Sequence, residues 1–477
     1  MDVKTVAAEG RRLPDKQEKR RFSVQHPSDA GRELTKAEIR KTIMSFSWPI
    51  IAELMLMSLI GVVNLAMVGH LGAYALSAAG LTNQPVFICL AVFQSFNVGA
   101  TALVSRFIGA KDYQEAKAVV IQTLIVSAIL GTVLAMIGVI FSKPIVLGMG
   151  AQPDTVEHAS MYMKYMAVGI LFQAIPTAVA SILRGAGNSR IPMQYNIASN
   201  IINAICGFVL IYGMGLFPGL GLQGAAIAST LAKFSACVMA VYAMFRSDLP
   251  VALSWRDRFR LELSILKRIM NIGISAAGEQ FFMRFGLMIY AIIIARLGTE
   301  ALAAHQICLS VTQLLSNVIN GFSMAASSFT GRNLGAKRPD LAERYCNELQ
   351  KIGLLFSVSA GLMFFFAGSS ISKIYTSDQE VIRQAAEVLR ITILIVVPQN
   401  YLSIVAGCLR GAGDTRWPLI SSFIGMIFAR VGLAALFVLV FHWGLVGAWM
   451  AAISDQSVRS VLIYYRFKSG KWKEIVV

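Results

Sequence analysis

Two acidic residues, Glu53 and Glu279, lie inside long apolar segments and occupy equivalent places in the two halves of the chain. An ionisable group inside a membrane-spanning segment costs about 2.5–3.5 kcal/mol on insertion scales, so it is a functional candidate by default. A buried carboxyl that takes up a proton could couple transport to a proton gradient. The same glutamates could instead hold helices together by pairing with loop arginines. The candidate partners are Arg106 or Arg184 for Glu53, and Arg332 or Arg410 for Glu279.

A second set of charges, Arg430 and Asp455, falls near the middle of two consecutive apolar segments. A lone buried charge would be prohibitive, whereas a pair is tolerable. We therefore expect a salt bridge that joins the last two helices, with contact to a substrate as the alternative. Arg284 has no such partner in the sequence, because Glu279, five residues earlier, lies about 140° around a helix.

Amide side chains recur through the apolar segments. Such groups form hydrogen bonds between helices or line a water-filled cavity. Their number favours a cavity, although helix packing remains the better interpretation for any single one. The candidate cavity amides are Asn64, Gln173, Asn203, Gln280, Gln306 and Gln399.

Other chemistry finds little support in the sequence. No group of histidine, cysteine and acidic residues has the spacing of a metal site, and no arrangement of Ser, His and Asp suggests a nucleophile. The six cysteines show no CxxC spacing and mostly fall in apolar segments, so we expect buried free thiols. We expect no metal, no cofactor beyond a coupling ion, and no enzymatic activity.

An internal duplication organises these residues. The run Leu183-Arg184-Gly185-Ala186-Gly187 recurs as Leu409-Arg410-Gly411-Ala412-Gly413, at an offset of 226 residues that also relates the two glutamates. A second offset of 223 residues relates Gly221-Leu222 to Gly444-Leu445. A repeat of this size predicts two structurally equivalent halves. In each copy the glycines allow a helix to end with positive φ, and a proline then opens the next helix.

The composition is that of a membrane protein. Of the 477 residues, 56% are hydrophobic and only 14% are charged, whereas a soluble domain carries about 25% charged residues. The net charge of +17 invites a nucleic-acid interpretation. We exclude it, because the basic residues lie in short connectors between apolar segments, as the positive-inside rule predicts.

Twelve segments are long and apolar enough to cross a bilayer as helices. We predict spans at about 43–69, 79–105, 118–141, 161–183, 192–213, 221–245, 272–297, 305–330, 352–371, 389–409, 417–441 and 444–466. These divide the chain into a cytoplasmic polar tail (1–42), an N-terminal six-helix lobe (43–245), a cytoplasmic linker (246–271), a C-terminal six-helix lobe (272–466) and a cytoplasmic basic tail (467–477).

The placement of basic residues puts both chain termini in the cytoplasm. Because six is even, each half starts and ends on the same side of the membrane. The two halves are therefore parallel repeats, related by a pseudo-two-fold axis along the membrane normal.

Three sets of residues match the pattern of a known family. They are Pro49 and Glu53 with Met67-Val68-Gly69-x-Leu71-Gly72, Ala303-Ala304-His305-Gln306, and the repeated LRGAG with Asn188 or Asp414 before a proline. With these motifs the chain resembles the multidrug and toxic compound extrusion (MATE) transporters over about residues 43–466. The resemblance implies a V-shaped pair of six-helix bundles around a central cavity, and export of organic cations in exchange for protons or sodium by alternating access.

The sequence departs from this family at the acidic positions that many relatives carry. Asn64 stands in the first helix where an Asp is common, Met283 in the seventh helix where some have Glu, and Gln399 in the tenth where some have Asp. Near Asn203, in the fifth helix, Gly207 replaces another Asp. Glu53 and Glu279 are therefore the membrane acids left to test for coupling.

We expect an all-α integral membrane protein of the plasma membrane, with 12 transmembrane helices. Its predicted function is export of small amphipathic, cationic organic compounds by a monomer that contacts membrane lipid and binds no nucleic acid. A lipid-linked or metabolite flippase of the same superfamily is the alternative, and it predicts unpaired basic residues in a groove open to lipid. The predicted coupling and substrate cavity comprises Glu53, Asn64, Gln173, Asn203, Glu279, Gln280, Met283, His305, Gln306 and Gln399, and the predicted structural charges are Arg184, Arg410, Arg430 and Asp455.

Overall fold

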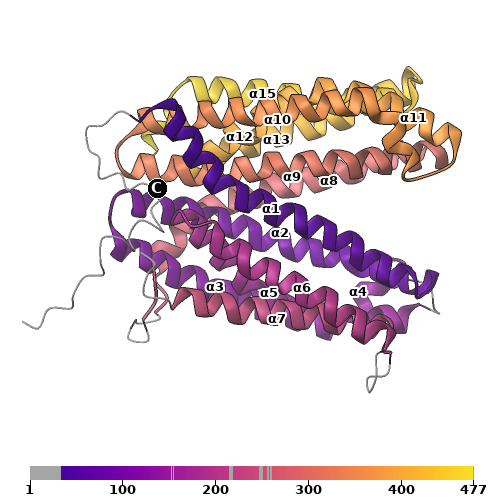
Figure 1. Cartoon of the computed structure of the whole chain (residues 1–477), viewed down its shortest axis with the longest axis horizontal. Helices are drawn as coiled ribbons and strands as arrows, with labels where there is room; N and C mark the ends of the chain where they lie inside the picture. The colour runs from indigo at the N-terminus through magenta and orange to yellow at the C-terminus, as the bar shows by residue number, and fades with distance from the viewer. Residues whose placement is uncertain are drawn as a thin grey trace, which may run out of the picture.

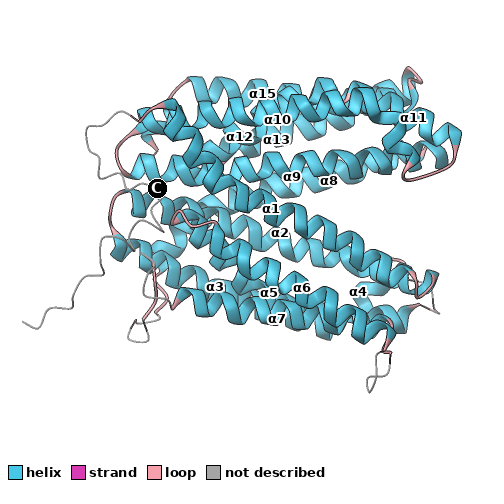
Figure 2. Ribbon diagram, in the orientation of Figure 1, coloured by secondary structure: helices cyan, strands magenta, loops and turns pink. Residues whose placement is uncertain are grey.

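Helices make up the regular structure of the part of the chain that the structure describes. The computed structural model describes residues 34–151, 153, 155–213, 219–245, 251–254, 257 and 260–475. Within these ranges every regular element is a helix (Figure 2). The first half contains α1 (Lys36–Gly69), α2 (Ala73–Gly109), α3 (Tyr113–Ile140), α4 (Ser142–Gly148), α5 (Val156–Gly185), α6 (Arg190–Tyr212) and α7 (Leu222–Met244).

The second half repeats this order with more interruptions. The eleventh span of the chain, Arg416–Val440, is one continuous helical segment. It contains two π-helical stretches, η2 (Ile424–Gly432) and η3 (Leu436–Val440). The elements are α8 (Leu263–Ala295), α9 (Thr299–Gly335), α10 (Pro339–Lys373), α11 (Gln379–Ile391), α12 (Ile393–Ala412), α13 (Arg416–Phe423), η2 (Ile424–Gly432), α14 (Leu433–Ala435), η3 (Leu436–Val440), α15 (Gly444–Lys468) and the 3₁₀ turn η4 (Lys471–Glu474).

The expected number of spans is confirmed. Eleven helices of the described chain are long and apolar enough to cross a membrane. The twelfth span is α15, whose 25 residues suffice in length but include Asp455 and Arg459. Several helix boundaries differ from those predicted. Residues 36–42, assigned to the tail, form the start of α1, α8 begins at Leu263 inside the predicted linker, and the short helices α4 and α11 were not anticipated.

The second glycine of each repeated turn has the expected backbone, whereas the first, Gly185 or Gly411, remains helical. Gly187 and Gly413 have φ values of 89° and 86°, in the left-handed region where a side chain is strained. Lys111 and Lys337, which are equivalent in the two halves, also have positive φ, at 61° and 57°. The duplication therefore extends to unusual backbone conformations as well as to helix order.

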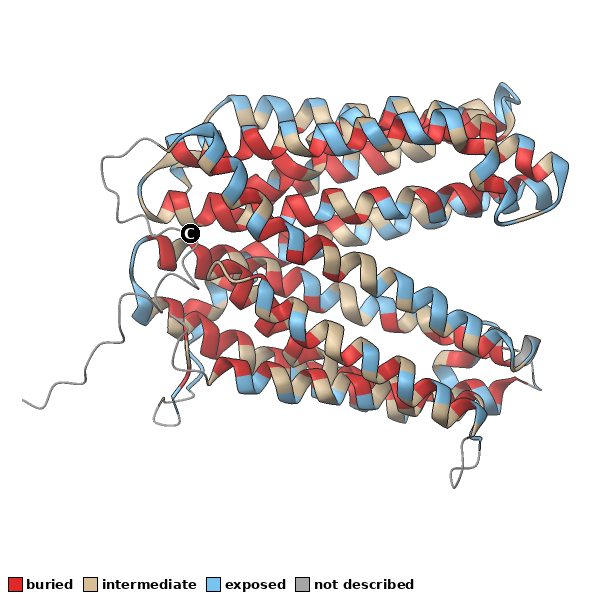
Figure 3. Cartoon of the chain, in the orientation of Figure 1, coloured by how far each residue is buried: buried red, intermediate tan, exposed pale blue. Residues whose placement is uncertain are grey.

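The helices form two lobes that meet at one end of the molecule and diverge toward the other (Figure 1). We call the end that carries the start of α1 the closed end, and the end that carries α4 and α11 the open end. Buried residues are dense where the lobes meet and become sparser toward the open end (Figure 3). The protein has the V shape that the family resemblance implied.

The first helix of each half crosses into the opposite lobe at the closed end. On α1, Ile39, Ile43 and Phe46 belong to a hydrophobic core made otherwise by the C-terminal half. On α8, Ile265 and Ile269 belong to a core made otherwise by the N-terminal half. The two lobes are therefore clasped by exchanged helix segments, each of which buries apolar side chains that would otherwise face water or lipid.

Two equivalent glycines allow α2 and α9 to touch at the closed end. A Cβ on Gly109 would lie 2.0 Å from the carbonyl oxygen of Arg332, and a Cβ on Gly335 would lie 1.9 Å from that of Arg106. Only glycine permits two backbones to approach so closely. The contact is reciprocal, as a pseudo-two-fold axis between the halves requires.

Candidate functional site

Glu53 is held by an arginine and an amide inside the N-terminal half. Arg184 Nη2, at the end of α5, donates to both carboxylate oxygens, at 2.6 and 2.7 Å. Asn196 Nδ2, from α6, donates to Oε1 at 2.8 Å. The carboxylate is buried, with 4% of its side chain exposed. Charge-assisted bonds of this length are the strong ones, so this cluster fixes α1 against α5 and α6.

The same pair recurs in the C-terminal half. Arg410 Nη2, near the end of α12, donates to Glu279 Oε1 at 2.6 Å, and its Nε lies 3.4 Å from Oε2. Glu279 is as buried as Glu53. Two arginines that were equal candidates by sequence, Arg106 and Arg332, lie instead at the crossing of α2 and α9. The symmetric pairing is the arrangement that the structural hypothesis requires, because each glutamate has an equivalent arginine as its partner.

The two halves differ at the position equivalent to Asn196. The equivalent residue is Ser422, whose hydroxyl accepts a hydrogen bond from Arg459 Nη2 at 2.8 Å. Arg459 was not among the predicted site residues. The signal that could have found it is the mismatch between the halves, because the residue equivalent to Arg459 is Ala236.

Arg430, Asp455 and Arg459 form a buried group that we call the C-half charge cluster. Arg430 Nε lies 3.1 Å from Asp455 Oδ2, without the alignment of a hydrogen bond, and Arg459 Nη1 lies 4.0 Å from the same oxygen. Asp455 is 0% exposed. The expected contact between the last two spans is therefore present, but two arginines share one carboxylate and leave a surplus positive charge.

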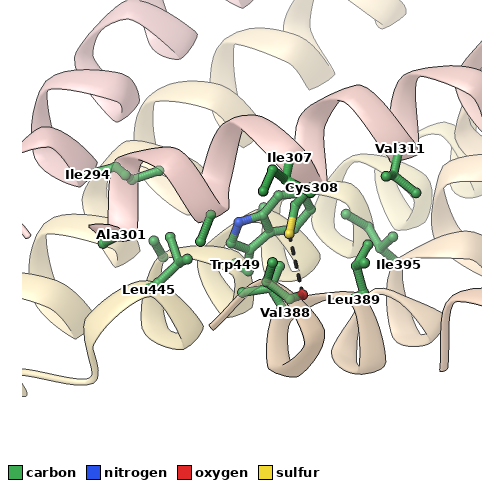
Figure 4. Packing of buried hydrophobic residues seen from close by; sticks show 14 of the residues in the cluster. Ile294, Ala301, Ile307, Cys308, Val311, Val388, Leu389, Ile395, Leu445 and Trp449 are labelled. Carbon is green, nitrogen blue, oxygen red and sulfur yellow. Dashed lines mark hydrogen bonds between the residues drawn. The ribbon is translucent and has the colours of Figure 1, made fainter. Parts of the chain in front are cut away.

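His305 lies beside this cluster, nearer the open end of α9. Its ring meets the rings of Tyr290 and Trp449 edge to face, with centroids 5.8 and 5.7 Å apart. Figure 4 shows Trp449 in the surrounding apolar core, where Cys308 Sγ donates to the Ala385 carbonyl at 3.5 Å. The surroundings of His305 are those of a packed core and differ from the cavity position predicted for it.

The residues predicted to line a cavity differ in their burial and contacts. Gln399 Nε2 donates to Ser316 Oγ at 3.0 Å within the C-terminal half. Asn203 is buried, whereas Gln306 on α9 is exposed. Asn64, Gln173, Gln280 and Met283 are half-buried.

One amide joins the two lobes directly. Asn317 Nδ2, on α9, donates to Ser58 Oγ, on α1, at 2.7 Å. Gln313 extends this contact by donating to Asn317 Oδ1 at 3.1 Å. Farther toward the open end, Val62 and Leu65, which lie within about 40° of Ser58 around α1, are 66% and 55% exposed, so the opposite lobe no longer covers this face of the helix. The lobes therefore separate just beyond Ser58.

The fold and the site together define a class of protein. Two parallel six-helix repeats enclose paired charges at membrane depth. This architecture is found among membrane transporters built from parallel repeats. The family model MatE matches residues 49–209 and again 276–436, one copy in each half. The chain belongs to this family and is a MATE transporter, an integral membrane protein.

Individual relatives agree with this assignment. The chain is 29% identical to the probable multidrug resistance protein NorM of Thermotoga maritima over 451 residues, which cover 92% of this chain and 94% of that protein. It is 26% identical to the multidrug export protein MepA of Staphylococcus aureus, over 90% of this chain and 94% of MepA.

Solved structures share the fold. An outward-facing structure of a multidrug resistance MATE family transporter of the MOP superfamily matches with a TM-score of 0.85 and 23% identity, over 93% of this chain and 100% of that one. A MOP superfamily transporter from Pyrococcus furiosus matches with a TM-score of 0.84 at the same identity, over 92% of this chain and 97% of that one. These similarities confirm the two-lobed fold of 12 helices.

Proposed function

We propose that this chain is a secondary exporter that moves small amphipathic organic compounds out of the cell by alternating access, in exchange for protons or sodium. The observation that carries the proposal is the unequal contact between the lobes. They touch backbone to backbone at Gly109 and Gly335, and they separate beyond Ser58. A transporter that alternates needs one end sealed while the other is open, and the exchanged segments of α1 and α8 provide that seal.

The distribution of charge supports one orientation in the membrane. The closed end carries basic connectors, including Lys111 and Lys337, and the positive-inside rule favours the cytoplasm for such connectors. The V then opens to the outside, as an exporter requires when it releases substrate. We place the protein in the plasma membrane as a monomer surrounded by lipid, with both termini in the cytoplasm. The relatives named for multidrug resistance or export support amphipathic drugs as substrates.

The ion pairs bear on coupling. Glu53 and Glu279 are each engaged by an arginine, and the same arrangement in both halves favours a structural role for them. The C-half charge cluster, by contrast, occurs in one half only. Asp455 is therefore the carboxylate that we would test for ion coupling before the two glutamates.

A lipid-linked or metabolite flippase is the second candidate, and one observation favours it. Arg284 on α8 and Lys233 on α7 make no hydrogen bond or ion pair with any described residue. Unpaired basic groups at membrane depth suit a substrate with an acidic head group. The two candidates differ in whether the substrate is water-soluble.

The test is efflux of ethidium and of an anionic amphipathic dye from cells that express the chain. The proton and sodium gradients are collapsed separately, and cells without the chain serve as the control. Efflux that stops with one gradient supports a coupled exporter and identifies its ion. Efflux of neither dye, from cells in which the protein is present in the membrane, would refute the exporter and favour the flippase.

A further inference from the structure

Resting on the proposed function, we infer that the exported compounds carry an anionic group, and that Arg284 binds this group in the space between the lobes. The proposal names the chemical class of the substrate and the side chain that selects it. It departs from the cationic substrate expected from the family resemblance. Three observations carry it: the position of Arg284, its exposure without a partner, and the pairing of the acidic residues at membrane depth.

The first observation is the face of α8 on which Arg284 lies. Near the closed end, Gly273 packs on α2, where an added Cβ would lie 3.3 Å from the Ser95 carbonyl oxygen. Arg284 is eleven residues farther along, which is three helical turns plus about 20°. Gly273, Gln280 and Arg284 therefore form one stripe that faces α2. Where the lobes diverge, this stripe opens onto the space between them.

The pseudo-two-fold axis gives the same placement independently. At the repeat offset, Arg284 corresponds to Ser58 on α1. Ser58 accepts a hydrogen bond from Asn317 of the opposite lobe, so its position is on the inter-lobe face. Arg284 occupies the equivalent face of α8, turned toward the opposite lobe. A wide guanidinium thus stands where the other half has a small hydroxyl.

The opposing helix supplies an apolar wall. On α2, Gly99 packs on α8 near the closed end, and Val92 and Ile88 continue the same face outward. Val92 and Ile88 are 41% and 67% exposed, so the opposite lobe does not cover them. Arg284 beside Gln280, facing an apolar strip, is complementary to an amphipathic molecule with one acidic group.

The second observation is that Arg284 is exposed and unpaired within a span. It lies eleven residues, about 16 Å, from the end of α8. Among the described residues it makes no hydrogen bond or ion pair, whereas Arg184 and Arg410 each bind a glutamate. A charge at this depth costs several kcal/mol unless it reaches water or a counter-ion. The fork of the guanidinium matches a carboxylate or sulfonate with two parallel hydrogen bonds.

The third observation concerns the acidic groups that would have to bind a cation. The three carboxylates in the middle of spans, Glu53, Glu279 and Asp455, are each within 3.1 Å of an arginine nitrogen. Arg459 adds a second cation to Asp455, and Lys233 is unpaired in the described chain. The interior at this depth therefore has more positive than negative charge, which attracts organic anions and repels organic cations.

The test uses three probes that share a fluorophore and differ in charge. Dansyl-leucine carries a carboxylate, its methyl ester is neutral, and dansylcadaverine is a cation. Each is titrated into the purified full-length protein in detergent, and the dissociation constant is read from dansyl fluorescence. We expect dansyl-leucine to bind about ten- to a hundred-fold more tightly than its ester, the range for one charge-assisted interaction.

Variants of one helix assign the effect. In Arg284→Gln the preference for dansyl-leucine over its ester should disappear, while the ester binds as before. Arg284→Lys keeps the charge but not the fork, and should retain part of the preference. Arg296→Gln, which removes an exposed arginine at the open end of the same helix, is the matched control and should change nothing.

The outcomes separate this inference from the proposed function. An unchanged preference in Arg284→Gln, or tighter binding of dansylcadaverine than of dansyl-leucine by the wild type, would overturn the anion site and leave an exporter of other compounds possible. Proteoliposome efflux, driven by an imposed proton or sodium gradient, tests export on the same probes. Selective binding of the anion that depends on Arg284, without gradient-driven efflux, would support the site and refute the coupled exporter.

Discussion

The reciprocal contact of Gly109 and Gly335 makes a strong prediction about alternating access. In Gly109→Ala the new Cβ would meet three backbone atoms of Arg332, with the carbonyl oxygen at 2.0 Å. No side-chain rotation can relieve a clash with backbone. Ordinary contact begins at 3.4 Å, so α2 and α9 must move apart at the closed end. The substitution should therefore destabilise the sealed state in which the V is open.

The size of the effect follows from the cost of overpacking. Inserting a methyl group into a tight contact costs about 1–3 kcal/mol. If the cost falls on the sealed state alone, the equilibrium between sealed and unsealed states shifts by about 5–150-fold. Gly109 and Gly335 meet the same pair of helix ends. Alanine at both positions should thus cost less than the sum of the two single changes.

Ser328 provides a reporter for this equilibrium. It is fully buried at the seam, where its hydroxyl donates to the Arg184 carbonyl oxygen across the two halves at 2.6 Å. In a background without the six native cysteines, a cysteine introduced as Ser328→Cys should react with a maleimide only when the seal opens. We expect Gly109→Ala to accelerate this labelling by about 5–150-fold.

The control lies on the same helix. A Cβ on Gly80 of α2 meets nothing within 4 Å, so Gly80→Ala should leave the labelling rate unchanged. Thermal melting of each variant shows whether the fold is retained. If folded Gly109→Ala labels at the rate of the wild type, the glycine crossing does not hold the closed end, and the mechanism proposed for the seal is wrong.

Three further changes test the ion pairs and the linker. Glu279→Gln leaves Arg410 without its partner and should destabilise the fold by about 3–5 kcal/mol, seen as a lower melting temperature that Glu279→Gln with Arg410→Gln partly restores. Gly425→Ser should also lower it, because a Cβ there would lie 2.4 Å from a buried carboxylate oxygen of the C-half charge cluster; an unchanged melting temperature would contradict this packing. Burial raises the pKa of Asp257, but hydrogen bonds from Lys117 and a backbone amide outweigh it and lower the pKa. The stabilisation from these hydrogen bonds is therefore present above the ordinary aspartate pKa of about 3.9, and it is lost as the pH falls through the lower pKa of Asp257 in the folded protein. Acid should then expose the linker to limited proteolysis. Asp257→Asn should remove this pH dependence.

The duplication, the number of spans and the family were predictable because they depend on short sequence patterns that can be recognised without knowing the fold. Twenty apolar residues specify a span whatever its neighbours are. The repeated LRGAG specifies a helix end with a glycine at positive φ, and Gly187 and Gly413 both have it. The equivalence of Glu53 and Glu279 likewise needed only a constant offset.

The partners of the glutamates needed the fold. Arg106 and Arg184 were equal candidates, since both lie at helix ends in the first half. Only the crossing of α2 and α9 excludes Arg106 as the partner of Glu53, because it places Arg106 against Gly335 of the other lobe. The exchange of α1 and α8 between lobes was also beyond the sequence. An apolar stripe indicates that one face of a helix is buried, but it does not indicate which lobe covers that face.

The differences between the halves are where we propose that the specialised chemistry lies. Where the C-terminal half has Asp455 and Arg459, the N-terminal half has Ala232 and Ala236. The size of the neighbouring residue changes together with these charges. Gly425 leaves room for the Arg459 side chain, which lies against it. The equivalent residue, Ser199, fits beside the smaller alanines and donates to the Ala232 carbonyl at 2.6 Å.

The helix that carries Arg430 and Gly425 is also the one with π-helical turns, which are frequent at functional sites. A scaffold made of two repeats needs stabilising ion pairs in both halves, whereas a transport cycle needs only one site that selects the substrate. The residues that break the symmetry, Arg284 and the C-half charge cluster, are therefore the ones to which we assign the function.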